Sequence, residues 1–200
     1  MNDVGPHGLH RVDGPGPTRP PVEVTSTAPR QTVRVIGETP ADDVTAEVDR
    51  HDLPLTVTWT PWPVEWLTLR VSGEHGGELE LRLDASTGSL VTAIVLIEPP
   101  GTIEDLRQAE RVRTAPSCTR PVVSRSWWLD EDGAMPWRPG PVFITVPHLA
   151  WRHEHDRIEV QLADRPVATR LRAKNVTVGV SANDDLVAFE IDLTNHHEGA

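Results

Sequence analysis

The fold of this 200-residue chain is decided by residues 78–97, ELELRLDASTGSLVTAIVLI. Leucine alternates with charged residues over 78–83, which is the period of a strand with one buried face. Residues 84–88 are the small and acidic residues typical of a tight turn. Residues 90–97 are apolar enough to return as a strand in the protein core. The stretch therefore predicts an antiparallel β-hairpin.

The same strand signal recurs through the rest of the chain. It appears over residues 32–37, 55–59, 66–71, 142–146, 158–162, 169–172, 176–180 and 186–193. Two segments differ. Residues 40–50 carry acids in their first turn, and residues 102–113 begin with Thr102 as a candidate N-cap, so both predict short helices. We expect a mainly β protein of antiparallel sheets and meander hairpins, with one or two short helices.

A second hairpin resembles the first. Residues 175–193, NVTVGVSANDDLVAFEIDL, also run from an alternating strand through a small, acidic turn to a Leu-Val that opens an apolar strand. Such a pair of related hairpin units arises by duplication, or because hairpins converge on this pattern. The sequence leaves both origins open.

The C-terminal segment also resembles a short bacterial family of unknown function, whose pattern is D-x-L-x-I-x-L … V-x-V-D-x-D-x-x-G-x-L-V-G-I-E-I. The chain departs from it at Asp185, in place of the turn glycine, and at Ala188, in place of the glycine after Leu-Val. The resemblance covers some forty residues of 155–193 and implies a small antiparallel meander with no known activity. The matching positions are Asp156, Ile158, Val160, Leu162, Leu186, Val187, Glu190 and Ile191.

The chain divides into three parts by composition. Residues 1–30 are rich in proline and glycine and poor in large apolar side chains, so we expect a disordered tail. Residues 31–194 form a single β-rich domain, with possible halves at 31–113 and 121–194. Residues 195–200 are expected to be a flexible C-terminus.

Composition also limits the function classes. The formal net charge is −11, which argues against a nucleic-acid or anionic-membrane binder because phosphate needs a cationic surface. Lys174 is the sole lysine, a bias typical of a GC-rich bacterial genome. Cys118 is the sole cysteine, so folding needs no intrachain disulfide. With no signal segment at the N-terminus and no apolar run of spanning length, we expect a cytoplasmic protein.

The tryptophans form one candidate binding group. Seven Trp with no Tyr is an unusual aromatic composition. Trp62 and Trp137 are flanked by prolines, so we expect them on loops, where an indole anchors a partner or a ligand. The competing interpretation, that tryptophan is the large core residue of a domain without tyrosine, is the one we adopt for Trp59, Trp66 and Trp151.

An acidic segment is a further candidate for partner or cation binding. Asp130, Glu131 and Asp132 precede a glycine, and they suit a basic partner if they are not simply a solvated loop.

A histidine pair is the candidate metal site. His153 and His155 are two residues apart, so a strand would point both to one face and let them chelate a divalent metal with one carboxylate. The third ligand is not fixed by the sequence, with Asp130 or Glu131 as guesses. The alternative is a polar entry to the strand that follows.

No catalytic motif singles out a reaction. The chain has neither a G-x-S-x-G nucleophile turn nor a phosphate-binding glycine loop. We therefore expect a non-enzymatic protein without a cofactor, which binds a basic protein partner as an immunity or antitoxin protein does. A homo-oligomer is left open. The alternative is a small-molecule-binding or metal-dependent hydrolytic protein that uses His153 and His155.

Overall fold

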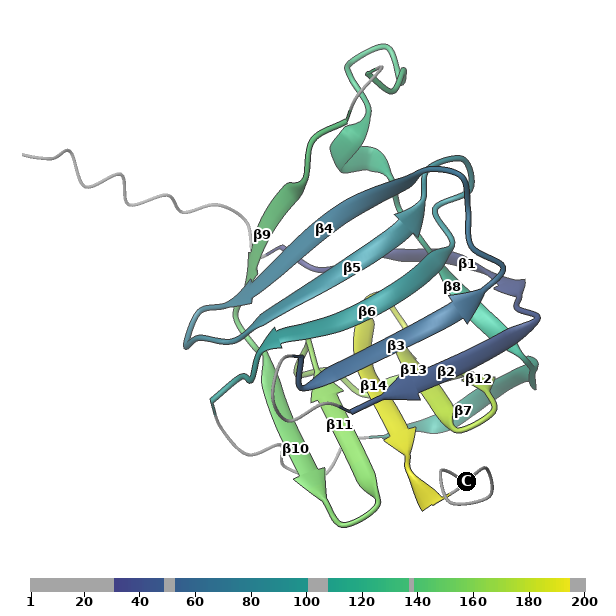
Figure 1. Ribbon diagram of the computed structural model, residues 1–200, viewed down its shortest axis with the longest axis vertical. Helices are drawn as coiled ribbons and strands as arrows, with labels where there is room; N and C mark the ends of the chain where they lie inside the picture. The colour runs from purple at the N-terminus through teal and green to yellow at the C-terminus, as the bar shows by residue number, and fades with distance from the viewer. Residues whose placement is uncertain (1–30, 49–52, 101–107, 137–138, 195–200) are drawn as a thin grey trace, which may run out of the picture.

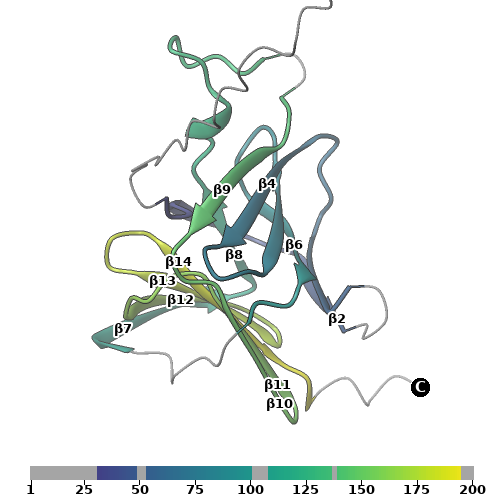
Figure 2. The ribbon, with the colours of Figure 1, turned by 90° about the vertical axis from the view of Figure 1, so that its left-hand side faces the viewer.

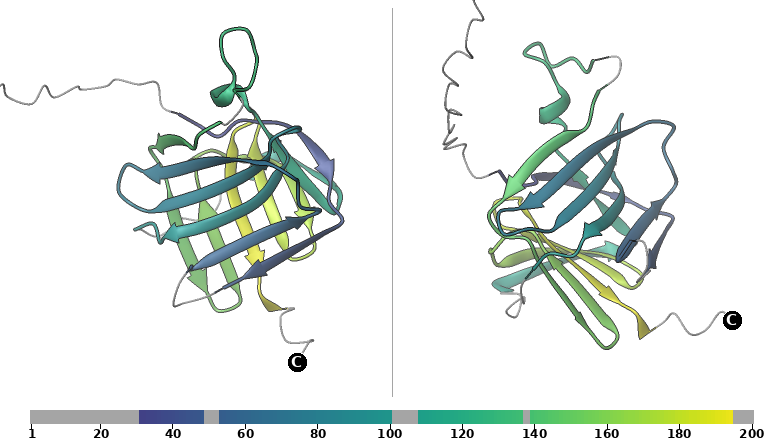
Figure 3. Two further views of the ribbon diagram at one scale, coloured as in Figure 1. Left: turned by 45° about the horizontal axis from the view of Figure 1, so that its top comes forward. Right: turned by 60° about the vertical axis from the view of Figure 1, so that its left-hand side comes forward.

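Two six-stranded sheets pack face to face in the computed structural model, which describes residues 31–48, 53–100, 108–136 and 139–194 (Figure 1). The strands of one sheet run across those of the other, as the left view of Figure 3 shows. Each sheet buries its apolar face against the other because side chains alternate between the two faces of a strand. The predicted mainly β fold is confirmed.

The first sheet has the order β2-β3-β6-β5-β4-β9. All neighbours are antiparallel except β4 and β9, which are parallel. Figure 2 shows β9 beside β4 at one edge. The strands are β2 (Asp43–Glu47), β3 (Leu55–Thr60), β4 (Trp66–Gly73), β5 (Glu78–Asp84), β6 (Leu90–Ile97) and β9 (Val142–Val146).

The second sheet has the order β10-β11-β14-β13-β12-β7. Again every neighbouring pair is antiparallel except the edge pair, β12 and β7. The strands are β7 (Gln108–Ser117), β10 (Ala150–Glu154), β11 (Arg157–Gln161), β12 (Val167–Ala173), β13 (Val176–Ser181) and β14 (Leu186–Asp192).

The two sheets have the same topology. A hairpin (β2-β3 or β10-β11) is followed by a three-stranded meander (β4-β5-β6 or β12-β13-β14) whose last strand pairs with the hairpin's second strand. The hairpins predicted at residues 78–97 and 175–193 occupy matching places, β5-β6 and β13-β14. Each sheet then takes its parallel edge strand from the connection between the two meanders. This match supports the duplication that the sequence left open.

A two-stranded ribbon joins the sheets at one end. It pairs β1 (Val35–Pro40) with β8 (Thr119–Val123). The chain before β1 bridges to the β13-β14 turn at Asp185, and Val122 bridges to the β5-β6 turn at Ser89. The ribbon therefore ties the matching turns of the two sheets together, ahead of the short 3-10 helix η1 (Ser126–Trp128).

The core is formed by side chains from both sheets. Trp59 of β3 is fully buried and lies with its ring centroid 6.3 Å from that of Phe189 on β14. Residues of β3, β4, β5, β11, β13 and β14 belong to one buried apolar cluster. The contact between Trp59 and Phe189 therefore lies at the centre of the packing between the two sheets.

Both predicted helices are wrong where the structure describes them. Residues 43–47, inside the predicted helix at 40–50, form β2. Residues 108–113, the end of the predicted helix at 102–113, belong to β7, and residues 101–107 lie outside the described residues. Edge pairing with β3 and β12 fixes these segments as strands, because tertiary pairing overrides weak local propensity. Within the described ranges no helix is long and apolar enough to cross a membrane.

Replacing Trp59 tests the layer contact. We expect Trp59→Ala to lower the free energy of unfolding by about 3–5 kcal/mol, the cost of removing a large buried aromatic side chain. Phe143→Ala is the matched control because Phe143 is 69% exposed on β9, and it is expected to change stability by less than about 0.5 kcal/mol. Urea unfolding of both variants measures the difference. Equal losses would contradict this account of the core.

Candidate functional site

Three apolar side chains project into solvent where β3 turns into β4. Trp62 is 52% exposed, Val64 97% and Trp66 47%. The two indole rings lie 6.4 Å apart and nearly perpendicular. We call Trp62, Val64 and Trp66 the tryptophan patch. Clustered exposed apolar side chains on a folded protein are typical of an interaction site.

The loop that carries the patch is held at both ends. It begins with a cis peptide bond between Thr60 and Pro61, and the Pro61 carbonyl lies 3.5 Å from Arg120 Nη1. At the other end the amide of Ala85 donates to the carbonyl of Glu65 over 3.1 Å. Because these contacts come from β8 and the β5-β6 turn, the patch has a fixed place on the sandwich.

An arginine supports the second indole. The Arg82 guanidinium lies 5.8 Å from the Trp66 ring centroid, in cation–π geometry. Its Nε also donates to Glu80 Oε1 over 2.7 Å. Glu80 is 4% exposed, so a buried carboxylate keeps Arg82 over the ring. Trp66 is therefore held in position by contacts within the sheet.

Carboxylates surround the patch. Asp42 and Glu65 are exposed, and Asp84 lies opposite Trp66 in the β4-β5 pair. The cation beneath the loop, Arg120, is 8% exposed, and burial lowers its pKa while Asp84 and Asp42 oppose that effect. The accessible charge beside the tryptophans is therefore mainly negative, apart from Arg82.

The predictions for the tryptophans divide. Trp59 is buried, as predicted, and Trp151 is half-buried against the core. The prediction of a core role is wrong for Trp66: it precedes Leu67, Leu69 and Val71, which are buried, so alternation places its indole on the outer face of the sheet. Trp62 is exposed on its loop. Trp137 lies outside the described residues.

The predicted acidic segment lies on a different loop from the tryptophan patch. It follows η1, in the loop at the top of Figure 1. Asp130 Oδ1 accepts from the amides of Asp132 (3.0 Å) and Ala134 (2.8 Å), so this carboxylate closes a turn. Glu131 and Asp132 are exposed at the tip of that turn.

The predicted histidine pair does not lie on one strand face. β10 ends at Glu154, and His155 has φ 47° in the turn before β11. The ring of His153 instead contacts Trp151, with centroids 6.3 Å apart. The turn thus removes the alternation on which the chelate hypothesis rests. In the described part of the chain no three His, Cys, Asp or Glu residues gather closely enough to hold a metal ion.

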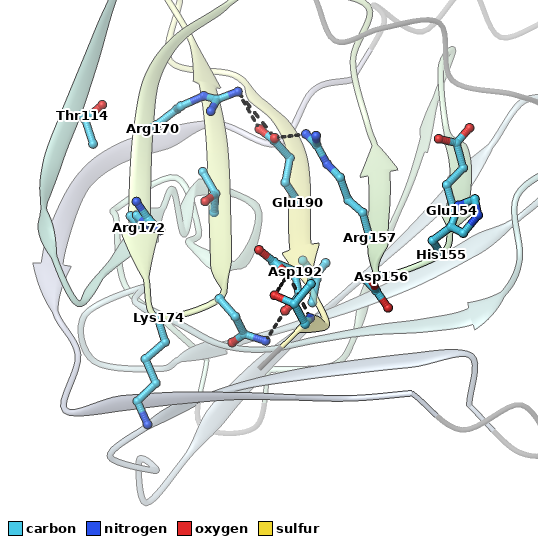
Figure 4. Close-up of a pocket in the computed structure, with 14 residues that line it drawn as sticks. Thr114, Glu154, His155, Asp156, Arg157, Arg170, Arg172, Lys174, Glu190 and Asp192 are labelled. Atoms are coloured by element: carbon cyan, nitrogen blue, oxygen red, sulfur yellow. Dashed lines mark hydrogen bonds and ion pairs between the residues drawn. The ribbon is translucent and has the colours of Figure 1, made fainter. Parts of the chain in front are cut away.

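The outer face of the second sheet carries a polar groove of about 590 Å³. Figure 4 shows arginines of β11 and β12 on either side of Glu190 of β14, with Glu154 and His155 at the far end. We call this feature the arginine groove. Its members used below are Thr114, Arg157, Arg170, Arg172, Thr177 and Glu190.

Ion pairs cross the floor of the groove. Arg157 Nη2 lies 2.6 Å from Glu159 Oε1 and 2.5 Å from Glu190 Oε2. Arg152 also pairs with Glu159, and Arg170 Nη2 lies 3.2 Å from Glu190 Oε1. The side chain of Glu159 is 2% exposed and that of Glu190 is 9% exposed. Each buried carboxylate therefore has two guanidinium partners, as burial of charge requires.

Sequence reasoning missed Trp66, Arg82 and the arginine groove. Alternation gave the usable signal: the strand prediction for 169–172 places Arg170 and Arg172 on one face. Glu190 comes from a strand that is separated from β12 by β13, and such a juxtaposition needs the sheet order. No protein-family model and no curated protein matches the chain.

The β5-β6 turn next to the patch depends on pH. Burial raises the pKa of Asp84, but hydrogen bonds from Ser86 and Thr87 outweigh it and lower the pKa overall. A carboxyl group whose pKa is lower in the folded than in the unfolded chain stabilises the fold at any pH above its unfolded-state pKa. That stabilisation is lost as the pH falls through the folded-state pKa. We expect Asp84→Asn to lower the urea midpoint at pH 7 and to lower it less at pH 3. An equal loss at both pH values would contradict the role of the charge.

Proposed function

We propose that this protein binds a protein partner through the tryptophan patch. The observation that carries the proposal is that Trp62, on a loop tied down at both ends, and Trp66, at the start of β4, are both half exposed. Exposing two indoles costs solvation free energy, which binding recovers. Tryptophan is also among the residues that contribute most to protein interfaces.

The charge around the patch favours a basic partner. Asp42, Glu65 and Asp84 lie beside it, and the whole chain carries a net charge of −11. Opposite charges speed the encounter of two proteins, while the indoles supply affinity once they meet. An immunity or antitoxin protein that acts against a basic effector would work in this way.

The partner is identified by capture and then measured with purified proteins. The full chain is used as bait in extracts of its source cell at low and high salt, and a captured protein is purified for titration. We expect a basic protein whose association rate falls as salt rises, because screening weakens steering. Recovery of no partner at either salt concentration would contradict the proposal.

Substitution then assigns the contact to the patch. We expect Trp62→Ala to weaken binding of the purified partner by about 30-fold or more, which corresponds to the roughly 2 kcal/mol of an interface hot spot. The control is Phe143→Ala, which removes an exposed aromatic ring from the same sheet and is expected to leave affinity unchanged. If both variants bind like the original protein, the interface lies elsewhere.

A further inference from the structure

Positive charge gathers at the β12 end of the arginine groove. Arg152, Arg157 and Arg170 pair with Glu159 and Glu190. Arg172 lies two residues after Arg170 on the same face of β12, is exposed, and makes no hydrogen bond or ion pair with any described residue. Its charge acts on Asp192 at longer range: hydrogen bonds from Thr194 are the main cause of the lowered pKa of Asp192, and Arg157 and Arg172 add to it. Arg170 and Arg172 thus place positive charge along β12 in the lining of the groove, in a protein whose overall charge is strongly negative.

Arg170 is only loosely engaged by its acid. Its Nη2 lies 3.2 and 3.5 Å from the two Glu190 oxygens, whereas Arg157 approaches to 2.5 Å. In addition, Arg170 Nε has no hydrogen-bond partner among the described residues. Arg157 therefore provides most of the neutralisation of Glu190, and Arg170 retains capacity for a second anion.

Hydroxyl groups lie beside the two arginines. The strand pairing places Thr114 of β7 next to Arg170 and Thr177 of β13 next to Arg172. Residues two apart on a strand are roughly 7 Å apart, so the flexible guanidinium groups of Arg170 and Arg172 can converge on one group. Guanidinium forks with flanking hydroxyls are the donor set that proteins use for phosphate and carboxylate oxygens.

The other end of the groove limits the size of the ligand. Glu154 and Asp156 line it there, at the end away from β12 in Figure 4, whereas Asp192 lies nearer β12, beside Asn175 of the β12-β13 turn. Their negative charges repel a long polyanion laid along the groove, which rules out a nucleic-acid strand as its natural occupant. A volume of about 590 Å³ is in the range of small-molecule sites.

We propose that the arginine groove binds a small molecule through a phosphate or carboxylate group, held by Arg170 and Arg172 between the hydroxyls of Thr114 and Thr177. This site is independent of the tryptophan patch, so either proposal can fail without the other. The protein would then have two binding sites, the tryptophan patch for a protein partner and the arginine groove for an anion of metabolite size.

The test is a titration of the isotope-labelled full chain followed by amide NMR. Sodium phosphate and citrate are added separately at constant ionic strength, and their relative affinities distinguish a phosphate site from a carboxylate site. We expect saturable shifts centred on β12 and β13. Shifts that grow without saturation for both ions, or that spread over all surface arginines, would overturn the proposal.

Variants make the assignment specific. Arg172→Gln is expected to weaken binding about tenfold because charge-assisted hydrogen bonds are lost, and Arg172→Lys to restore part of the affinity. The fold should tolerate both, since Arg172 is exposed and makes no hydrogen bond or ion pair within the described ranges; circular dichroism checks this. Arg34→Gln, at another exposed arginine whose side chain makes no hydrogen bond or ion pair in the part of the chain that the structure describes, controls for net charge and is expected to change affinity by less than twofold. Equal effects of Arg172→Gln and Arg34→Gln would overturn the site.

Discussion

Each sheet of the sandwich is completed by a strand from the connection between the two meanders. β7 leaves the first meander and pairs in parallel with β12, while β9, which leads into the second hairpin, pairs in parallel with β4. The two crossings make each half depend on the other for a complete sheet edge, in addition to the core that they share at Trp59 and Phe189. The positions of the tryptophan patch and the arginine groove both follow from this arrangement, because each is built on a meander that these edge strands complete.

The shared core leaves the outer faces free to differ. β4 begins with the exposed Trp66, whereas β12, its topological counterpart, begins with the buried Val167. Conversely, the arginine groove lies over β12, β13 and β14, while the matching face of the first sheet pairs Arg70 and Arg82 with Glu80. Two units of one topology thus present an aromatic, acid-rimmed surface on one layer and an arginine-rich groove on the other. The proposed partner surface, the tryptophan patch, and the proposed small-molecule site, the arginine groove, thus lie on different sheets.

Alternation was a sufficient signal for the hairpins, since residues 78–83 and 176–180 each bury one face locally. It was also sufficient to place Trp66 outside, although the preference of tryptophan for cores led to the opposite prediction. The segment 102–113 shows the limit: a good N-cap and apolar spacing are compatible with a helix, yet residues 108–113 form a strand because β12 offers a parallel partner far along the chain. The arginine groove could not be predicted for the same reason. The order of the strands in the sheet brings Arg157, Arg170 and Glu190 together, and the sequence does not give that order. The prediction of a chelating histidine pair was wrong for a different reason. His155 itself has a left-handed backbone conformation, so the strand that carries His153 ends one residue before it.

The crossing of β9 also has a consequence during synthesis on the ribosome. Strands β2 to β6 are complete once residue 97 has emerged, but the edge of β4 that β9 will cover stays unpaired until residues 142–146 follow. An open edge offers backbone donors and acceptors to any neighbouring chain. An unfinished chain therefore has an open β4 edge to which a wrong strand can add, and the finished molecule hides that edge under β9.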